Sequence, residues 1–202
     1  MSHYFTNDYV ESNENEIKVK IKNTDLTFIT DNGVFSKHGL DFGTRSLLEN
    51  LPIQVLKGDI LDFGCGYGPI GIYLKKNTSA NIDMLDVNER ALNLARKNAK
   101  INNVSVNIFQ SDLYTNVTKK YDYIVTNPPI RVGKKTLYKI LFEAEKHLKP
   151  DGKLLFVINK NQGAKTTARD LSKIYEVTII AKNKGFYIIS AKKHWQPRET
   201  KV

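Results

Sequence analysis

The sequence predicts an α/β protein whose core is a doubly wound, mostly parallel sheet of seven strands. From residue 58 onward, short apolar runs alternate with segments of helical periodicity, which is the pattern of successive strand–helix units. A glycine-rich loop, GCGYG, joins the first of these runs to the first helical segment. The last two apolar runs flank Lys-Asn-Lys-Gly, a sequence typical of a hairpin turn, so the sheet should end in an antiparallel pair.

The composition is that of a single globular domain. Its 202 residues are 41% hydrophobic and 26% charged, and no apolar run approaches the roughly 20 residues that span a bilayer. The N-terminal residues do not follow the pattern of a secretion signal. The single cysteine cannot form an internal disulfide, so we expect a cytoplasmic protein. The net charge of +10 favours a polyanionic partner such as nucleic acid, although solubility in a lysine-rich organism would explain it as well.

Residues 1–50 are expected to form an N-terminal extension packed on the same domain, which itself covers residues 51–202. Apolar residues alternate with polar ones between Ile17 and Phe28, and the turn sequence at residues 31–33 indicates a β-hairpin. A short helix should follow over residues 44–51, with Thr44 as its N-cap and Pro52 just beyond its end.

The remaining elements follow in order along the chain. Strands are predicted over residues 59–63, 81–87, 106–110, 121–126 and 153–159, with a final hairpin within residues 175–193. The first helix starts near Pro69, a residue suited to the first turn of a helix. The second helix lies within residues 88–103, where Leu92, Ala95 and Ala99 form an apolar face. A third helix over residues 136–148 ends at Lys-Pro-Asp-Gly, a stop signal.

The glycine loop has the residues of a ligand-binding turn. In a doubly wound sheet this turn lies at the carboxyl ends of the strands, where ligands bind. Gly64 and Gly66 permit positive φ angles and a close approach of a ligand to the backbone. Pro69 replaces the third glycine of a dinucleotide-binding loop, and Asp62 would repel a pyrophosphate. A ligand with a cationic amine and no phosphate fits better, and S-adenosylmethionine has both properties.

Acidic residues also follow the next two strands. Asp86 lies 20 residues after Gly66, a spacing at which a carboxylate accepts hydrogen bonds from ribose hydroxyls, although Asp86 or Asn88 would also cap the next helix. Ser111 and Asp112 end the third strand. There Asp112 would accept a hydrogen bond from an adenine amino group, although Ser-Asp is also ordinary turn chemistry. Ligand contacts are therefore predicted at three successive strand ends.

The fourth strand ends abruptly at Asn127-Pro128-Pro129. Two prolines cannot continue a ladder of hydrogen bonds, and this strand should lie next to the first, beside the glycine loop. The Asn127 side-chain oxygen and the Pro128 carbonyl can both accept hydrogen bonds from an aromatic amine, whose lone pair is otherwise conjugated into its ring. Two fixed acceptors would direct that lone pair toward an electrophilic methyl group.

The runs LDFGCGYGPIG, LDVN and TNPPI resemble those of the class I S-adenosylmethionine-dependent methyltransferases that modify exocyclic amines. The run GVFSKHGLDFGTRSLLENLP over residues 33–52 is similar, more closely, to the catalytic domain of the bacterial 16S ribosomal RNA guanine-N2 methyltransferases, in their short, single-domain branch. The likeness covers residues 25–193. It implies a Rossmann-like class I methyltransferase fold with strand order 3-2-1-4-5-7-6.

The resemblance also implies roles for individual residues. The methionine part of the cofactor would contact Asp62, Gly64, Cys65 and Gly66. Asp86 would hold the ribose and Asp112 the adenine, with the neighbouring Asn88 and Ser111 counted in the same site, and the segment with Phe35 and Ser36 would close over the cofactor. The catalytic segment would be Asn127, Pro128, Pro129 and Ile130, in which Ile130 replaces the aromatic residue usual in the family.

Four basic residues follow the catalytic segment and are predicted to contact RNA phosphates; they are Arg131, Lys134, Lys135 and Lys139. A solvated charged face is the alternative interpretation. The four histidines show no metal-ligand spacing, so no metal site is predicted.

The sequence thus predicts a methyltransferase that moves a methyl group from S-adenosylmethionine to the exocyclic amino group of a nucleobase, guanine-N2 of ribosomal RNA, and leaves S-adenosylhomocysteine. Its partner would be ribosomal RNA or the small ribosomal subunit, with no membrane and no metal, and the sequence predicts no oligomeric state. Two alternatives remain. One is a methyltransferase of a small molecule or a protein glutamine. The other is a non-catalytic RNA-binding or ribosome-assembly protein that keeps the cofactor pocket.

Overall fold

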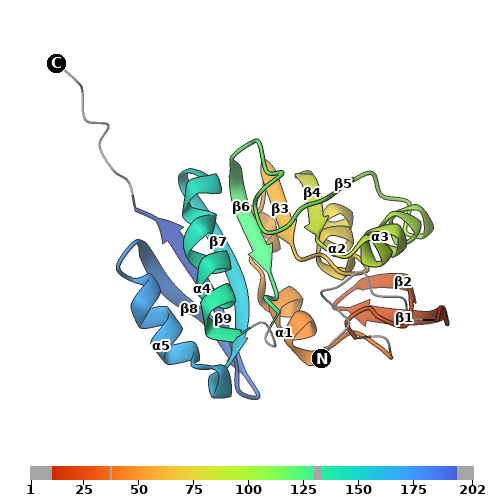
Figure 1. Cartoon of the computed structure of the whole chain (residues 1–202), viewed down its shortest axis with the longest axis horizontal. Coiled ribbons are helices and arrows are strands. Elements are labelled where there is room, and N and C mark those ends of the chain that lie inside the picture. Colours follow the sequence, from red (N-terminus) through yellow and green to blue (C-terminus); the bar gives the residue numbers. More distant parts are fainter. Residues whose placement is uncertain (1–10, 37, 130–132, 195–202) are drawn as a thin grey trace.

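The computed structural model describes residues 11–36, 38–129 and 133–194, and it contains the predicted seven-stranded sheet (Figure 1). The strands stand in the order β5-β4-β3-β6-β7-β9-β8, which is the predicted order 3-2-1-4-5-7-6 when the sheet's own strands are numbered along the chain. Neighbours from β5 to β7 are parallel, β9 is antiparallel to β7, and β8 is antiparallel to β9. The predicted α/β fold class is confirmed.

The strands of the sheet lie close to the predicted ranges. Their bounds are β3 Asp59–Phe63, β4 Asn81–Asp86, β5 Asn107–Gln110, β6 Tyr121–Thr126, β7 Leu148–Asn159, β8 Tyr175–Asn183 and β9 Phe186–Lys193. Strand β7 begins earlier than expected, because Leu148 already pairs with Tyr121 before the register shifts and Lys153 pairs with Tyr123.

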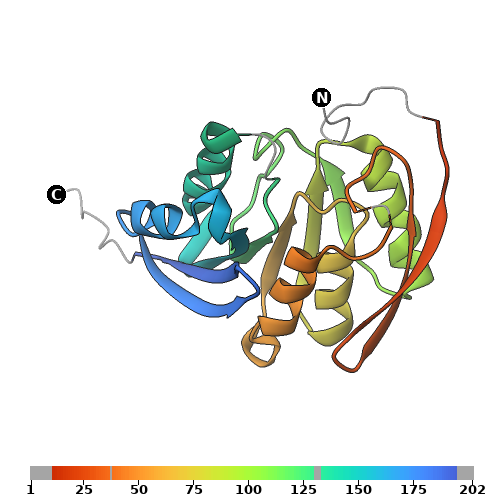
Figure 2. The ribbon, with the colours of Figure 1, turned by 90° about the horizontal axis from the view of Figure 1, so that it is seen from below.

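Helices cover both faces of the sheet. One face carries α1 Phe42–Asn50, α2 Pro69–Asn77 and α3 Glu89–Ile101, and the other carries α4 Gly133–Glu143 and α5 Ala164–Leu171 (Figure 2). Short 3-10 turns are η2 Ile53–Val55, η4 Ala144–His147 and η5 Lys160–Gln162. The sequence pattern did not predict α5. It placed α4 over residues 136–148, three residues late at the start and five at the end, where η4 and the first residue of β7 follow instead. Within the described residues, no helix is long and apolar enough to cross a membrane.

The N-terminal hairpin packs on α3 and is bonded to it through two asparagine side chains. Its strands are β1 Asn15–Ile21 and β2 Thr24–Thr30. The amide of Asn98 both donates to the Ile29 carbonyl and accepts from the Ile29 N–H, at 2.9 and 2.7 Å. The amide of Asn102 makes the same pair of bonds with Thr27, at 2.7 and 3.1 Å. Two side chains, one within α3 and one at its C-cap, therefore satisfy backbone groups of β2.

The turn of this hairpin differs from the sequence prediction. Ile21 pairs with Thr24, so the turn consists of Lys22 and Asn23, and Lys22 adopts a positive φ of 51°. The Asp31-Asn32-Gly33 sequence instead follows β2 and starts the segment that leads to α1. Its turn chemistry marks a change of direction after the hairpin and not the hairpin turn itself.

The start of α1 also differs from the prediction, with consequences for the site. Asp41, and not Thr44, caps the helix: its Oδ1 accepts from the backbone N–H groups of Gly43 and Thr44 at 2.9 and 3.2 Å. An aspartate in this place satisfies two of the free N–H groups of the first turn. For α3, the cap is Asn88, whose side chain accepts from the Ala91 N–H at 3.2 Å.

Replacing Asn98 with Ala should lower the free energy of unfolding by about 2–4 kcal/mol. Asn98 is fully buried, and its side chain also donates to the Tyr67 carbonyl at 2.8 Å, so the variant leaves backbone groups of both β2 and the glycine loop unpaired. Urea unfolding measures the change, with Asn93→Ala as the control because Asn93 is exposed on the same helix. Equal stability of the two variants would contradict the anchoring role of Asn98.

Candidate active site

The carboxyl ends of β3, β4 and β6 meet at one edge of the sheet, and the glycine loop joins β3 to α2 at that edge (Figure 1). Gly64 and Gly66 adopt φ angles of 70° and 54°. A β carbon placed on either glycine would meet no atom within 4 Å, so both face open space. The loop therefore offers bare backbone to a ligand, as the sequence predicted for a cofactor cradle.

Asp62, at the end of β3, is a buried carboxylate with one oxygen left over. Its Oδ2 accepts from the Gly71 N–H at 2.8 Å, whereas Oδ1 is buried and has no hydrogen-bond partner among the described residues. Burial, with a smaller contribution from the negative charge of Asp86, raises the pKa of Asp62 to about 8. A bound ammonium group would satisfy Oδ1 and favour the ionised form. This orphaned oxygen beside an open glycine loop fits the amine of S-adenosylmethionine.

Asp86, at the end of β4, ties the glycine loop to the neighbouring strand. Its Oδ2 accepts from the Gly66 N–H at 2.8 Å and its Oδ1 from the Asn88 N–H at 2.9 Å. Burial raises the pKa of Asp86, and this effect exceeds that of the backbone hydrogen bonds, which lower it. A carboxylate can accept about four hydrogen bonds, so Asp86 retains acceptor capacity for ribose hydroxyls, and ribose binding stays a prediction.

Two of the other predicted cofactor residues have side chains that already make contacts within the protein. Ser111 donates its hydroxyl to the Leu113 carbonyl at 2.8 Å and accepts from the Asn116 N–H at 3.1 Å, so its side chain closes the loop after β5. Asp112 is exposed on that loop. The Cys65 side chain is buried in the core, and burial raises the pKa of its thiol well above the ordinary value. Only the backbone of Cys65 is placed for contact with a ligand.

Residues 33–36, which precede α1, lie next to the start of α3 at the same edge of the sheet. Asn88 donates its side-chain N–H to the Gly33 carbonyl at 3.3 Å, which links residues 33–36 to the start of α3. Phe35 is 49% exposed, and Ser36 has a positive φ of 60° and donates its hydroxyl to the Gly39 carbonyl. The structure thus brings the predicted covering segment next to Asn88, and its closure over the cofactor stays a prediction.

Asn127 directly follows β6 and is held by residues of the N-terminal extension. Its Nδ2 donates to the Thr44 hydroxyl at 2.9 Å and lies 3.3 and 3.4 Å from the two carboxylate oxygens of Asp41. A carboxylate can only accept hydrogen bonds, so the amide must turn its nitrogen to Asp41. The Asn127 Oδ1 is then free of described partners and remains as an acceptor. Because only the amide nitrogen is bonded within the described chain, the amide oxygen can accept a hydrogen bond from an amine.

The sequence analysis did not assign Asp41 and Thr44 to the site. Both lie within the GLDFGT run, which was used only for the resemblance and for a helix cap. The contact could not be predicted, because it joins residues 86 and 83 positions apart in the chain.

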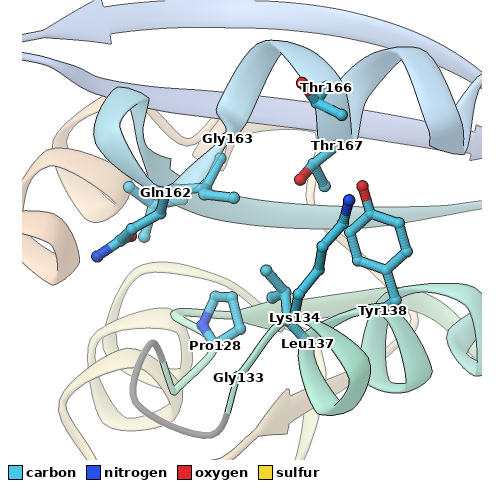
Figure 3. Close-up of a pocket in the computed structure, with 11 residues that line it drawn as sticks. Pro128, Gly133, Lys134, Leu137, Tyr138, Gln162, Gly163, Thr166 and Thr167 are labelled. Carbon is cyan, nitrogen blue, oxygen red and sulfur yellow. The ribbon is translucent and has the colours of Figure 1, made fainter.

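A cavity of about 310 Å³ lies next to Pro128, between α4 and α5 (Figure 3). Pro128 forms one wall, and the Lys134 and Tyr138 side chains extend from α4 toward Thr167 on α5. The ammonium of Lys134 is 5.0 Å from the centre of the Tyr138 ring. The remaining lining residues are Gly133, Leu137, Val157, Ile158, Gln162, Gly163 and Thr166. The cavity therefore combines apolar walls with a cation and hydroxyl groups.

The predicted RNA-binding residues fall into two groups. Lys134, Lys135 and Lys139 are exposed on α4, and only Lys134 lines the cavity. Ile130 and Arg131 lie outside the described residues. Within the part of the chain that the structure describes, no group of His, Cys, Asp or Glu residues could hold a metal ion.

The strand order, the open glycine loop after a buried carboxylate, and the Asn-Pro-Pro end of the neighbouring strand together define a class I S-adenosylmethionine-dependent methyltransferase. Comparison with known families agrees: the methyltransferase small domain matches residues 25–190. The chain belongs to this family, and the predicted cofactor, S-adenosylmethionine, is confirmed at this level.

Related proteins place the chain more closely. It is 44% identical over 197 residues, 95% of this chain and 98% of the other, to the uncharacterized protein YbxB of Bacillus subtilis. It is 38% identical over 147 residues to ribosomal RNA small subunit methyltransferase C of Psychromonas ingrahamii, covering 70% of this chain and 42% of that protein. For the protein of that name from Aliivibrio fischeri, the identity is 35% over 184 residues, covering 88% and 53%. The chain thus spans about half the length of these methyltransferases.

Among solved structures, the fold matches the T. thermophilus 16S rRNA N2 G1207 methyltransferase (RsmC), determined in complex with AdoMet and guanosine. The TM-score is 0.81, with 23% sequence identity, over 93% of this chain and 52% of the other. At this identity the likeness shows the shared fold, and the recognition predicted from the sequence is confirmed by the family and the relatives together.

The contribution of Asp62 to the stability of the cofactor-free protein should fall as the pH rises from about 4 to about 8, and Asp62→Asn should remove this contribution. Folded Asp62 has a pKa of about 8 against an ordinary 3.8, so between these values the folded state binds more protons than the unfolded state. This contribution to stability therefore decreases with rising pH, by at most about 1.4 kcal/mol per unit for one group. Asn cannot ionise, so the variant should gain on the wild type toward pH 8.

Urea unfolding of the cofactor-free proteins at several pH values tests this, with exposed Asp25→Asn as the control. Parallel profiles for wild type and Asp62→Asn would contradict the pKa assigned to Asp62.

Proposed function

We propose that this protein transfers a methyl group from S-adenosylmethionine to the exocyclic amino group of a nucleobase, and that the acceptor is guanine-N2 of small-subunit ribosomal RNA. The observation that carries the proposal is the hold on Asn127. Thr44 and Asp41 occupy its amide nitrogen and leave Oδ1 as an acceptor at the end of β6, the strand that pairs with β3 directly before the glycine loop.

The arrangement of acceptors suits an amine that is a weak nucleophile. The Asn127 Oδ1 and the Pro128 carbonyl would each accept one N–H of the amino group, which favours a pyramidal nitrogen with its lone pair directed away from the ring. The prolines restrict the backbone, and Thr126 donates its hydroxyl to the Phe63 carbonyl at 2.8 Å, which fixes the end of β6 to β3. Acceptors fixed before the substrate arrives need no reorganisation during the reaction.

Different parts of the cofactor would contact different residues at the carboxyl edge of the sheet. Asp62 would hold the amine of S-adenosylmethionine, the Gly64–Gly66 backbone its methionine part, and Asp86 its ribose. When bound, S-adenosylmethionine supplies an electrophilic methyl group on its sulfonium, and S-adenosylhomocysteine is the product. The chain needs no general base for the first step, because the amine can release its proton to water after it is methylated.

RNA is the substrate class that the surface and the relatives favour. The net charge is +10, and exposed Lys134, Lys135 and Lys139 stand on α4 close to the catalytic segment. Cationic side chains at such a place bind phosphates. The relatives named ribosomal RNA small subunit methyltransferase C support the ribosomal assignment. The cavity beside Pro128 would accept a group of this substrate, with Lys134 at its rim.

The direct test is methyl transfer from labelled S-adenosylmethionine to ribosomal RNA. Small and large ribosomal subunits, and RNA extracted from each, should come from a strain that lacks the gene. The proposal expects label in small-subunit RNA alone, recovered after nuclease digestion as N2-methylguanosine. Label in another nucleoside would overturn the guanine assignment. Absence of label from every RNA, with cofactor binding measured on the same sample, would shift the function to a small molecule or a protein amine.

Asn127→Ala should reduce the methyl transfer rate at saturating substrates by about a hundredfold or more, while S-adenosylmethionine affinity stays within about twofold. The variant removes a substrate acceptor and no cofactor contact. Asp86→Ala should instead weaken the binding of S-adenosylmethionine, which calorimetry measures. An Asn127→Ala enzyme that keeps wild-type turnover would rule out the amine-binding role.

Thr44→Val should slow methyl transfer about tenfold without changing cofactor affinity. Valine has the shape of threonine but cannot accept the hydrogen bond from the Asn127 Nδ2 at 2.9 Å. The amide then keeps only its longer contacts with Asp41, at 3.3 and 3.4 Å, and its orientation is less firmly fixed. Thr44→Ser, which keeps the acceptor, is the matched control and should retain most of the rate. If Val and Ser variants lose the same rate, the cause is packing and not the orientation of Asn127.

A further inference from the structure

A second surface of exposed cations and partly exposed aromatic rings lies at the β8–β9 turn, next to α1. It consists of Phe42, Lys160, Lys182, Lys184 and Phe186, and we call it the hairpin-turn surface. The sequence analysis treated the Lys182–Gly185 run only as a turn.

The topology of the sheet brings this turn to the active-site edge. Strand β9 is antiparallel to β7, so its first residue, Phe186, pairs with Asn159 at the carboxyl end of β7. The Lys160 N–H donates to the Gly185 carbonyl at 2.7 Å. Asn183 donates its side-chain N–H to the Ser46 hydroxyl at 3.1 Å, which attaches the turn to α1. Both views of the chain show the β8–β9 turn next to α1 (Figures 1 and 2).

The surface combines rings with cations held above them. The Lys184 ammonium is 5.4 Å from the centre of the Phe42 ring. The Lys182 ammonium is 4.9 Å from the centre of the Tyr187 ring, which is buried on the other face of the sheet and is not itself available for stacking. The Phe42 and Phe186 rings are 5.6 Å apart at an interplanar angle of 54°. Phe42 is 36% exposed, so part of its ring remains accessible to a ligand.

The surface is continuous with the hold on Asn127. Phe42 directly follows Asp41, whose carboxylate lies 3.3 Å from the Asn127 amide nitrogen. A β carbon placed on Gly43 would lie 3.0 Å from the Phe186 ring and 3.1 Å from the Asp41 carboxylate, so ring and carboxylate flank the same point of the backbone. A base held at Asn127 would therefore have its neighbouring nucleotides within reach of these rings.

The charges of this surface are not neutralised within the described chain. Lys160, Lys182 and Lys184 are exposed, and none of them forms an ion pair with a described carboxylate. Residues 152–169 and 177–193, which form most of β7, η5, most of α5 and most of the β8–β9 hairpin, contain no Asp or Glu. Three free cations in a stretch without acidic residues form a surface for polyanions.

We propose that the hairpin-turn surface binds a single-stranded segment of the RNA substrate next to the methylated nucleotide, an inference that rests on the proposed function. Stacking rings interleaved with cations are the recurrent means of binding single-stranded nucleic acid, because the rings stack on bases and the lysines contact phosphates. With Lys135 and Lys139 on the other flank, the strand crosses the carboxyl edge of the sheet and is held on both sides of the target base.

The test is the affinity for a fluorescently labelled single-stranded fragment of 16S RNA that contains the methylated position, measured by anisotropy at several salt concentrations. Lys182→Gln with Lys184→Gln should weaken binding about tenfold and lower the slope of log affinity against log salt by about 1.4, since each lost phosphate contact removes about 0.7. The control pair is Lys18→Gln with Lys20→Gln, two exposed lysines at the same spacing on strand β1 of the N-terminal hairpin, which should change neither quantity.

A second variant separates stacking from charge. Phe42→Leu keeps an apolar side chain and should weaken binding about three- to tenfold with the salt slope unchanged. In both variants, turnover at saturating RNA and affinity for S-adenosylmethionine should stay within about twofold of the wild type.

The outcomes distinguish this inference from the proposed function. A wild-type protein that neither binds nor methylates the RNA would overturn both. A wild type that binds and methylates it, with Lys182→Gln/Lys184→Gln indistinguishable from Lys18→Gln/Lys20→Gln, would overturn the hairpin-turn surface alone. Loss of turnover at saturating RNA in the lysine variant would also overturn it, because a surface that only holds flanking RNA affects binding and not the chemical step.

Discussion

The parallel pairing of β3 with β4 and of β3 with β6 is the constraint on which the site depends. Parallel strands end at the same edge of a sheet, so Asp62, Asp86 and Asn127, which are far apart in the chain, come together without any loop having to reach across the molecule. The glycine loop leaves that edge open. The same rule explains the further surface, because β9 runs the other way and therefore begins where β7 ends.

The N-terminal segment completes what the sheet provides. Two residues at the carboxyl edge of the sheet are bonded to it. Asn127 bonds Asp41 and Thr44, and Asn88 bonds Gly33. The hairpin before it is anchored on α3 by Asn98, which also bonds the Tyr67 carbonyl of the glycine loop. Asp41 serves twice, since the carboxylate that caps α1 also orients the Asn127 amide. One side chain thus links the start of the helix to the direction of the proposed acceptor, together with Thr44.

Much of the fold could be predicted from the sequence, because its signals are local. Apolar runs of strand length and Pro69 at a helix start each act within a few residues, and the strand order followed from the family resemblance. The predicted stop at residues 149–152 lies inside β7, since α4 already ends at Glu143. The hairpin turn was misplaced, since Lys22-Asn23 is weaker turn chemistry than Asp31-Asn32-Gly33 and only the pairing of Ile21 with Thr24 decides between them.

The site was accessible from the sequence only where it follows strand ends. Asp62, Asp86 and Asn127 could be placed at one edge because the fold dictates it. The contacts of Asn127 with Asp41 and Thr44 and the rings beside Lys184 could not, because they depend on how α1 and the last hairpin pack together. The Ser111 side chain shows the converse: a residue in the right place whose hydroxyl the local loop already uses.

The central claim is that Asn127 receives the 2-amino group of a guanine. The most direct measurement compares single-turnover methyl transfer to two RNA fragments that differ only at the methylated position, one with guanosine and the other with inosine, which lacks the 2-amino group. The account predicts transfer to the guanosine fragment alone, with both fragments bound at similar affinity. Equal transfer to the inosine fragment would contradict it, because the accepting atom would then not be the exocyclic amine.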